Sequence, residues 1–149
     1  MKTLSENKKA YFDYEILDKF EAGLVLTGQE VKSIRLGRGN LKGSYVVLRN
    51  EEVFLVGSNV PPYQPKNAPS DYNPEQDRKL LLNKDEIRKL IGKTKEKKIT
   101  LVPLKLYSKN GKIKLAFGIG KGKGKADKRE TIKKRDTKRE IDKELKSRG

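Results

Sequence analysis

The feature that most constrains the fold of this chain is a pair of apolar stretches separated by an Asn-Gly dipeptide. Residues 99–107 and 113–119 carry apolar side chains at alternating positions, and Asn110 and Gly111 lie between them. Both residue types tolerate the positive φ angles that a two-residue hairpin turn requires. The pattern therefore predicts an antiparallel β-hairpin. Pro103 cannot donate a ladder hydrogen bond, so its strand is expected to lie at a sheet edge or to carry a bulge.

The same period of two recurs nearer the N-terminus, where it predicts further short strands. These apolar stretches occupy residues 12–16, 22–26, 45–48, 53–56 and 80–82. The polar residues 49–52 separate two of the stretches and suit a second tight hairpin. The chain is therefore expected to be built mainly from antiparallel strands.

Two helices are expected to interrupt these strands, because two segments have the form of a capping box. The segments are Thr-Gly-Gln-Glu at 27–30 and Asn-Lys-Asp-Glu at 83–86, and each precedes an apolar stripe of helical spacing. A glycine follows each stripe and is expected to end the helix, Gly37 in the first and Gly92 in the second.

Five or six short strands with two helices, all within residues 9–120, are typical of a small closed barrel. The expected fold class is mainly β with flanking helices: an OB-like (oligonucleotide-binding) closed antiparallel β-barrel plus a basic C-terminal tail. A β-sandwich is the alternative. The Pro-, Asn- and Tyr-rich loop 61–74 is long for a compact domain, and such loops are often functional or disordered.

The charge of the chain indicates the kind of partner it binds. Lys and Arg number 36 against 20 Asp and Glu, a net charge of +16, and there is no Cys, His or Trp. This excess points to a polyanion, either nucleic acid or an anionic membrane face. No apolar run approaches the roughly 20 residues that span a bilayer, and the N-terminus lacks the apolar core of a signal peptide. We therefore expect a cytoplasmic protein that binds nucleic acid and no membrane.

The missing residue types also restrict the chemistry. Without Cys or His there is no thiol or imidazole nucleophile, no zinc knuckle and no disulfide. Two groups of acidic residues lie close in the sequence: Asp13, Asp18 and Glu21, and Asp71, Glu75 and Asp77. Neither group forms a recognised metal motif. We therefore expect no enzyme activity, no catalytic residue, no cofactor and no metal site.

The apolar content divides the chain into three parts. Residues 121–149 carry 13 Lys or Arg and 6 Asp or Glu, a net +7, and contain no apolar stripe that would dock on a core. We expect 1–8 to be a flexible N-terminal segment, 9–120 an OB-like RNA-binding body, and 121–149 a basic tail. The tail is expected to be disordered when free and helical when a polyanion neutralises its charge.

Glycines and lysines alternate between the body and the tail, in residues 118–125. The spacing matches neither a Walker A loop nor a dinucleotide-binding loop, because the required glycines and the Ser or Thr are missing. The segment is interpreted as a flexible, cationic hinge that phosphates can approach.

Several of these segments, taken together, resemble the SmpB (small protein B) family of SsrA-binding proteins. They are Asn-Lys-Lys at 7–9, Phe-Glu-Ala-Gly-Leu-Val-Leu-Thr-Gly-Gln-Glu-Val-Lys-Ser-Ile-Arg at 20–35, Gly-Asn-Leu-Lys-Gly-Ser-Tyr at 39–45, Arg-Lys-Leu-Leu-Leu at 78–82, Leu-Val-Pro-Leu-Lys-Leu-Tyr at 101–107, and Gly-Ile-Gly-Lys-Gly-Lys and Asp-Lys-Arg at 118–123 and 127–129. They cover nearly the whole chain in collinear order. One departure is Ala126, where relatives usually have His or Tyr.

The resemblance implies an RNA-binding adaptor of trans-translation. Such a protein binds the tRNA-like domain of transfer-messenger RNA (tmRNA) and delivers it to the A site of stalled bacterial ribosomes. The tail then occupies the decoding centre, formed by small-subunit rRNA, and the empty mRNA channel. Elongation factor Tu with GTP is an indirect partner through the RNA, and a monomer is expected.

The resemblance also implies two sets of RNA-binding residues. Contacts to the tRNA-like domain are expected from Asn7, Lys8, Lys9, Glu21, Lys32, Arg35, Asn40, Arg78, Lys79 and Leu81. Contacts to the decoding centre and mRNA channel are expected from Lys121, Lys123, Lys125, Asp127, Lys128, Arg129, Lys133, Lys134 and Arg135. An OB-fold ribosomal protein or general translation factor is the alternative function, and a carboxylate-dependent nuclease is a more distant one.

Overall fold

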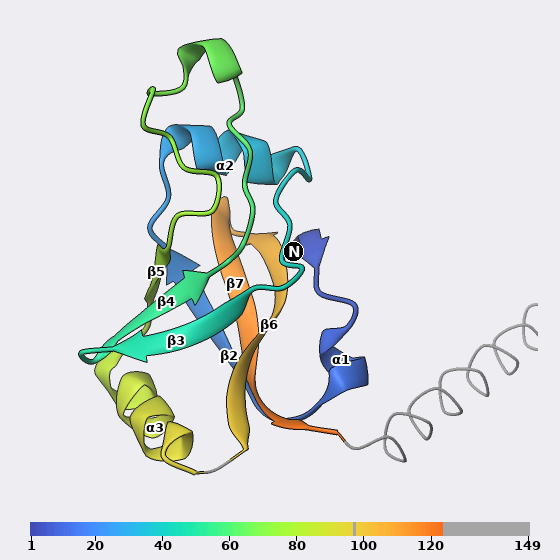
Figure 1. The fold of residues 1–149 in the computed structure, drawn as a ribbon, viewed down its shortest axis with the longest axis vertical. Coiled ribbons are helices and arrows are strands. Elements are labelled where there is room, and N and C mark those ends of the chain that lie inside the picture. Colours follow the sequence, from blue (N-terminus) through green and yellow to red (C-terminus); the bar gives the residue numbers. More distant parts are fainter. Residues whose placement is uncertain (97, 124–149) are drawn as a thin grey trace, which may run out of the picture.

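A computed structural model of the 149-residue chain describes residues 1–96 and 98–123. The described residues contain seven strands: β1 Lys2–Glu6, β2 Tyr14–Leu24, β3 Tyr45–Arg49, β4 Glu52–Val56, β5 Arg78–Leu81, β6 Ile99–Lys109 and β7 Lys112–Gly122. Their order in the sheet is β1-β6-β3-β4-β5-β2-β7, and β6 also pairs with β7. Because that last pairing closes the ring, the sheet is an antiparallel barrel (Figure 1). The predicted barrel is therefore confirmed, and the sandwich alternative is wrong.

Three α-helices flank the barrel in the described part of the chain: α1 Ala10–Asp13, α2 Gly28–Arg35 and α3 Lys84–Thr94. A 3-10 turn at Pro65–Asn67 lies within loop 61–74. Both predicted capping boxes are present, with side chain and backbone bonded reciprocally at the starts of α2 and α3. Figure 1 shows α2 across one end of the barrel and α3 near the other. None of these helices is long and apolar enough to cross a membrane.

The predicted end of α3 is wrong. The helix passes through Gly92 and ends at Thr94. A glycine inside a helix costs only about 1 kcal/mol relative to alanine, and Leu90, two residues earlier, is fully buried in the barrel core. Packing of the helix therefore outweighs the local preference of the glycine. In α2, by contrast, Gly37 follows the last turn with a φ of +78°.

Both predicted hairpins are present. Asn110 and Gly111 have φ angles of +52° and +75°, and Asn50 and Glu51 have φ angles of +50° and +65°. The two positive angles in each turn match the right-handed twist of the strands they join. The first two apolar stretches, predicted as separate strands, belong mostly to the single strand β2, which has a register shift between Ile16 and Asp18.

The N-terminal segment differs from the prediction, because residues 2–6 form strand β1. This strand pairs with β6, with Lys2 opposite Ser108 and Thr3 opposite Tyr107. Leu4 packs against the barrel core. Pairing satisfies backbone groups along a stretch of β6 that β3 does not cover, since β3 meets β6 only where Val46 faces Leu101. Residues 2–6 of the predicted flexible segment 1–8 are therefore part of the sheet.

The glycine-rich segment also differs from the predicted hinge, since residues up to Gly122 belong to β7. Gly118 and Gly120 are buried and lie where neighbouring strands come very close. A Cβ atom on Gly118 would lie 2.7 Å from Ile16 Cγ2 and 3.0 Å from the carbonyl oxygen of Asp18. These glycines therefore permit close strand packing.

We expect Gly118→Ala to lower the free energy of unfolding by about 1–3 kcal/mol, because the added methyl group overpacks the interface with β2. Urea unfolding measures this change. Gly122→Ala is the matched control in the same strand, since a Cβ there meets nothing within 4 Å. Equal stability of the two variants would contradict the packing role of Gly118.

Candidate nucleic-acid interface

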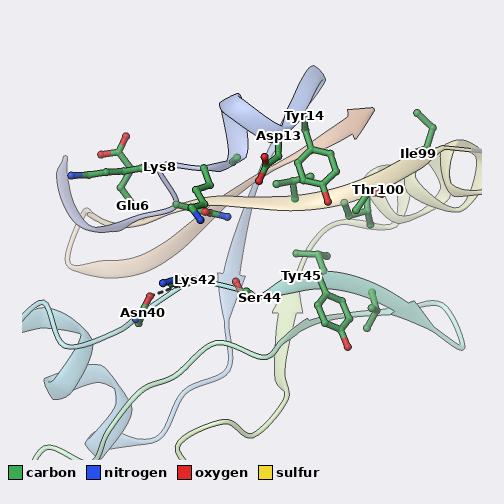
Figure 2. Close-up of a pocket in the computed structure, with 18 of the residues that line it drawn as sticks. Glu6, Lys8, Asp13, Tyr14, Asn40, Lys42, Ser44, Tyr45, Ile99 and Thr100 are labelled. Atoms are coloured by element: carbon green, nitrogen blue, oxygen red, sulfur yellow. Dashed lines mark hydrogen bonds between the residues drawn. The ribbon is translucent and has the colours of Figure 1, made fainter. Parts of the chain in front are cut away.

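A wide cationic cleft opens beside β6, where β3 and β6 diverge after their single paired position. The cleft has a volume of about 1120 Å³, and we call it the cationic cleft because Lys8, Lys9 and Lys42 line it. In Figure 2, Lys8, Asp13 and Tyr14 lie along one wall, and Asn40, Lys42 and Tyr45 lie along the other. Glu6 and Asp13 also line the cleft, so the three lysines leave it with a small net positive charge. A net positive charge in a concave surface attracts a polyanion.

Four of the residues predicted to contact RNA line the cationic cleft: Asn7, Lys8, Lys9 and Asn40. Lys8, Lys9 and Asn40 are exposed. The side chain of Asn7 has a structural partner, because its Nδ2 donates to the carbonyl oxygen of Pro103 at 2.9 Å. Asn40 accepts from the Lys42 amide at 2.9 Å and pairs with Asn59 in an isolated bridge. The structure thus gathers these four residues, from distant parts of the sequence, around one cavity.

A second basic surface lies on the outer side of β2, β6 and β7, and we call it the basic outer face. Side chains at alternate positions of a strand share one side, and residues opposite in register point the same way. Glu21 faces Ala116, Tyr107 faces Lys114, and Lys109 faces Lys112. The lysines of this surface are Lys19, Lys105, Lys109, Lys112 and Lys114.

Glu21 is the carboxylate among these lysines. It accepts a hydrogen bond from the hydroxyl of Tyr107, and the Lys109 ammonium lies 3.4 Å from the same oxygen, Oε2. The hydrogen bond from Tyr107 is the main cause that lowers the pKa of Glu21, followed by the effect of Lys109. Burial and the neighbouring carboxylate raise the pKa of Tyr107. Near neutral pH the pair is therefore a carboxylate and a neutral hydroxyl.

A smaller groove of about 330 Å³ adjoins the basic outer face and brings together two further predicted residues, Arg35 and Leu81. Leu81 lies opposite Gly23 of β2 and is 53% exposed, a high value for a leucine. Arg35, at the end of α2, donates to the carbonyl oxygen of Gly111 at 2.9 Å and so fixes the β6–β7 turn against the helix. Leu24, Leu26, Val31 and Ile113 line the groove together with Lys112 and Lys114.

Two other predicted residues lie apart from these surfaces. Lys79 is exposed on β5, 3.7 Å from Glu52. The Lys32 ammonium lies 5.5 Å from the ring centre of Tyr63, which belongs to loop 61–74. The loop is attached to α2 at a further point, since the Gln64 amide donates to Gln29 at 2.9 Å. Whether Lys32 and Lys79 contact RNA stays a prediction.

Arg78 requires a correction, because the structure buries the side chain that the resemblance assigns to RNA. The residue is 2% exposed. Its guanidinium pairs with buried Glu30 and donates to five acceptors, which are Glu30 Oε2, the Ser58 carbonyl and Oγ, and the carbonyls of Gln76 and Pro74. RNA cannot reach this group in the folded protein. Arg78 therefore has a structural role.

We expect Arg78→Leu to lower the free energy of unfolding by about 3–5 kcal/mol, because it leaves the Glu30 carboxylate buried without its partner. Chemical denaturation measures the loss. Arg49→Leu removes an exposed ion pair with Asp77, 2.6 Å long, and is expected to cost less than about 1 kcal/mol. Similar losses in the two variants would contradict the assignment.

The same ion pair predicts how stability depends on pH. Burial raises the pKa of Glu30, but the Thr27 amide and Arg78 outweigh burial and hold it below the ordinary value of 4.5. Ionised Glu30 therefore stabilises the fold above that pH, and the contribution is lost as the pH falls through the lowered pKa. We expect Glu30→Gln to reduce the loss of unfolding free energy at acid pH, measured by unfolding at several pH values. This acid part of the pH profile is called the acid limb. An unchanged limb would show that other carboxyls cause it.

Two residues predicted to contact the ribosome lie within the described part of the chain. Lys121 is exposed in β7, where it pairs with Glu15 and Ile99. Lys123 Nζ donates to the carbonyl oxygen of Tyr11 at 2.8 Å, so its ammonium contacts α1. The remaining members of this set lie outside the described residues: Lys125, Asp127, Lys128, Arg129, Lys133, Lys134 and Arg135.

Sequence reasoning missed several residues of these surfaces. The prediction did not include Lys42 of the cleft or Tyr107. It also omitted the lysines that the β6–β7 hairpin places on the basic outer face, which are Lys105, Lys109, Lys112 and Lys114. A signal existed for the strand lysines, because Lys105, Lys109, Lys112 and Lys114 occupy one side of the predicted hairpin. The acidic residues do not gather: no group of three or more carboxylates in the described residues is arranged to hold a metal ion.

A closed barrel with a cationic cleft and a lysine-rich outer face defines a polyanion-binding β-barrel protein. The chain belongs to the SmpB family, since the family model described as "SmpB protein" matches residues 4–147. The SsrA-binding protein of Bacillus pumilus is 53% identical over 147 residues, which cover 99% of this chain and 94% of that protein. The SsrA-binding protein of Thermosynechococcus vestitus is 49% identical over 148 residues, covering 99% and 97%.

A solved structure gives the corresponding comparison of folds. One of its chains is 41% identical to this one, with a TM-score of 0.66, and the match covers 85% of this chain and 92% of that one. The structure is described in the words "tmRNA-SmpB: a journey to the center of the bacterial ribosome".

Proposed function

We propose that this protein is the RNA-binding adaptor of trans-translation: it binds the tRNA-like domain of tmRNA and delivers it to the A site of stalled bacterial ribosomes. The observation that carries the proposal is the family match over residues 4–147, together with relatives named SsrA-binding proteins. The solved neighbour, whose description joins tmRNA, SmpB and the bacterial ribosome, supports the same partners. The place of action is then the cytoplasm.

The two basic surfaces provide the physical basis for binding a folded RNA. Lysines along a rigid barrel contact phosphates without reading sequence, and the shape of the barrel selects the fold of the RNA. In this proposal two sets of residues contact the tRNA-like domain. One is Lys8 and Lys9 in the cationic cleft, and the other is Glu21 on the basic outer face with Leu81 in the adjoining groove. The protein makes or breaks no bond. It acts as a monomer and meets elongation factor Tu with GTP only through the RNA.

RNA binding tests the proposal directly. We expect a labelled tRNA-like domain to bind much more tightly than a plain RNA duplex of similar length, in a filter or fluorescence assay. Affinity should fall with salt by a log–log slope of about 0.7–0.9 per neutralised phosphate. Lys112→Ala should reduce that slope by about 1, and Lys66→Ala, in the exposed 3-10 turn, should leave it unchanged. Equal affinity for the duplex would favour a general RNA-binding protein of the ribosome or translation machinery instead.

A truncation separates binding from delivery. We propose that residues beyond 123 contact the decoding centre and mRNA channel, so deleting residues 124–149 should leave affinity for the tRNA-like domain within about threefold. The deletion should abolish tagging of stalled chains in a reconstituted translation system. The cut preserves all of β7, which ends at Gly122. Loss of most RNA affinity in the truncated protein would contradict this division of labour.

A further inference from the structure

Tyr107 is a buried tyrosine whose hydroxyl reaches the surface of the barrel at one point. The residue is 3% exposed, and the Lys105 ammonium lies 5.4 Å from the centre of its ring. The hydroxyl donates to Oε2 of Glu21, across the outer side of the barrel from β6 to β2. A buried hydroxyl needs a partner, so this bond fixes both groups.

Glu21 has acceptor capacity left after that bond. Its side chain is 41% exposed, and a carboxylate has about four lone-pair sites. The titratable and charged groups that face it are Tyr107 and Lys109 from β6 and Lys114 from β7. Lys109 Nζ lies 3.4 and 3.5 Å from the two carboxylate oxygens, at the long end of hydrogen-bond distances. The remaining acceptor sites are therefore open to a ligand.

We propose that Tyr107 is a positioning residue for RNA recognition, holding the Glu21 carboxylate in one orientation so that it accepts hydrogen bonds from base-edge donors of a structured RNA. This inference rests on the proposed function and deepens it. Tyr107 itself does not contact the RNA.

The physical reason lies in the surrounding charge. A basic face attracts any phosphate, so it gives affinity and little discrimination. A carboxylate at its centre repels phosphates and accepts only from donors, such as the amino and imino groups on a base edge. These edges are hidden in a plain duplex and exposed in loops. A Glu21 side chain without this hydrogen bond would move among the lysines, and ordering it when RNA binds would cost conformational entropy. The bond from Tyr107 orders the side chain before RNA binds, so binding no longer carries that cost.

The pKa directions agree with this geometry. The hydrogen bond from Tyr107 is the largest cause that lowers the pKa of Glu21. Removing the hydroxyl therefore returns the pKa toward its ordinary range and brings protonation to a higher pH. A protonated Glu21 loses its charge and part of its acceptor capacity.

The test compares Tyr107→Phe, Glu21→Ala and the double variant in binding to the tRNA-like domain and to a plain RNA duplex. Phe keeps the ring and removes only the hydroxyl. We expect Tyr107→Phe to weaken binding of the tRNA-like domain about tenfold and to leave duplex binding unchanged. In the Glu21→Ala background the same substitution should have no effect, because no carboxylate remains to be positioned.

Two further measurements separate positioning from a general structural role. The acid limb of the binding profile should move to higher pH in Tyr107→Phe, and thermal melting verifies that the variant is folded. Tyr72→Phe is the matched control, since its hydroxyl donates to the backbone oxygen of Val60 at 2.7 Å and lies beside the buried Arg78. It should bind as the wild type does.

The proposal is overturned if Tyr107→Phe binds the tRNA-like domain as tightly as the wild type. It is also overturned if the loss is equally large in the Glu21→Ala background or equally large for duplex RNA. Failure of the proposed function looks different, because in that case the unmodified protein itself would not prefer the tRNA-like domain over the duplex.

Discussion

The buried ion pair between Arg78 and Glu30 is the interaction on which the positions of α2 and of loop 61–74 depend. Glu30 completes the capping box of α2, and the Arg78 guanidinium joins it to Ser58 after β4 and to the end of loop 61–74. Taking two charges out of water costs several kcal/mol each. The bond from the Thr27 amide to Glu30 and the four further bonds from Arg78 help to offset that cost. The position of α2 follows from this ion pair. Arg35, at the far end of that helix, can then reach the Gly111 carbonyl and close the groove beside Leu81.

Local signals in the sequence predicted the secondary-structure elements. Contacts between residues distant in the sequence determine the roles of individual side chains. The two hairpin turns and the two capping boxes depend on neighbouring residues only, and all four are present. Arg78 carried no such signal: its partner Glu30 is 48 residues away, and an arginine beside a lysine reads as a surface residue. The prediction of a flexible hinge at the glycines of β7 was wrong for a related reason. Their composition is that of a flexible linker, and only the approach of β2 and of Val102 shows why no side chain fits.

The candidate interface was predictable in part for the same reason. Family resemblance supplied Asn7, Glu21 and Leu81, yet neither composition nor periodicity could show that two of them share one side of the barrel and the third lines a different cavity. Tyr107 was missed because an aromatic residue in an alternating strand is more often part of the core. It is buried, but its register places it on the outer side of β6, opposite Lys114. Only the direction of its hydroxyl, toward Glu21 of β2, reveals a second role.

Strand β6 connects the two basic surfaces, so their relative orientation depends on its shape. Residues 99–102 line the cationic cleft, while Lys105 and Lys109 belong to the basic outer face. Between them the register shifts, as expected where Pro103 lacks an amide hydrogen. Asn7 holds this bulge from outside, with its side chain on the Pro103 carbonyl and its amide on the Leu104 carbonyl at 2.8 Å. A substitution of Asn7 would therefore disturb both surfaces at once. Weakened RNA binding in such a variant would not by itself establish that Asn7 touches RNA.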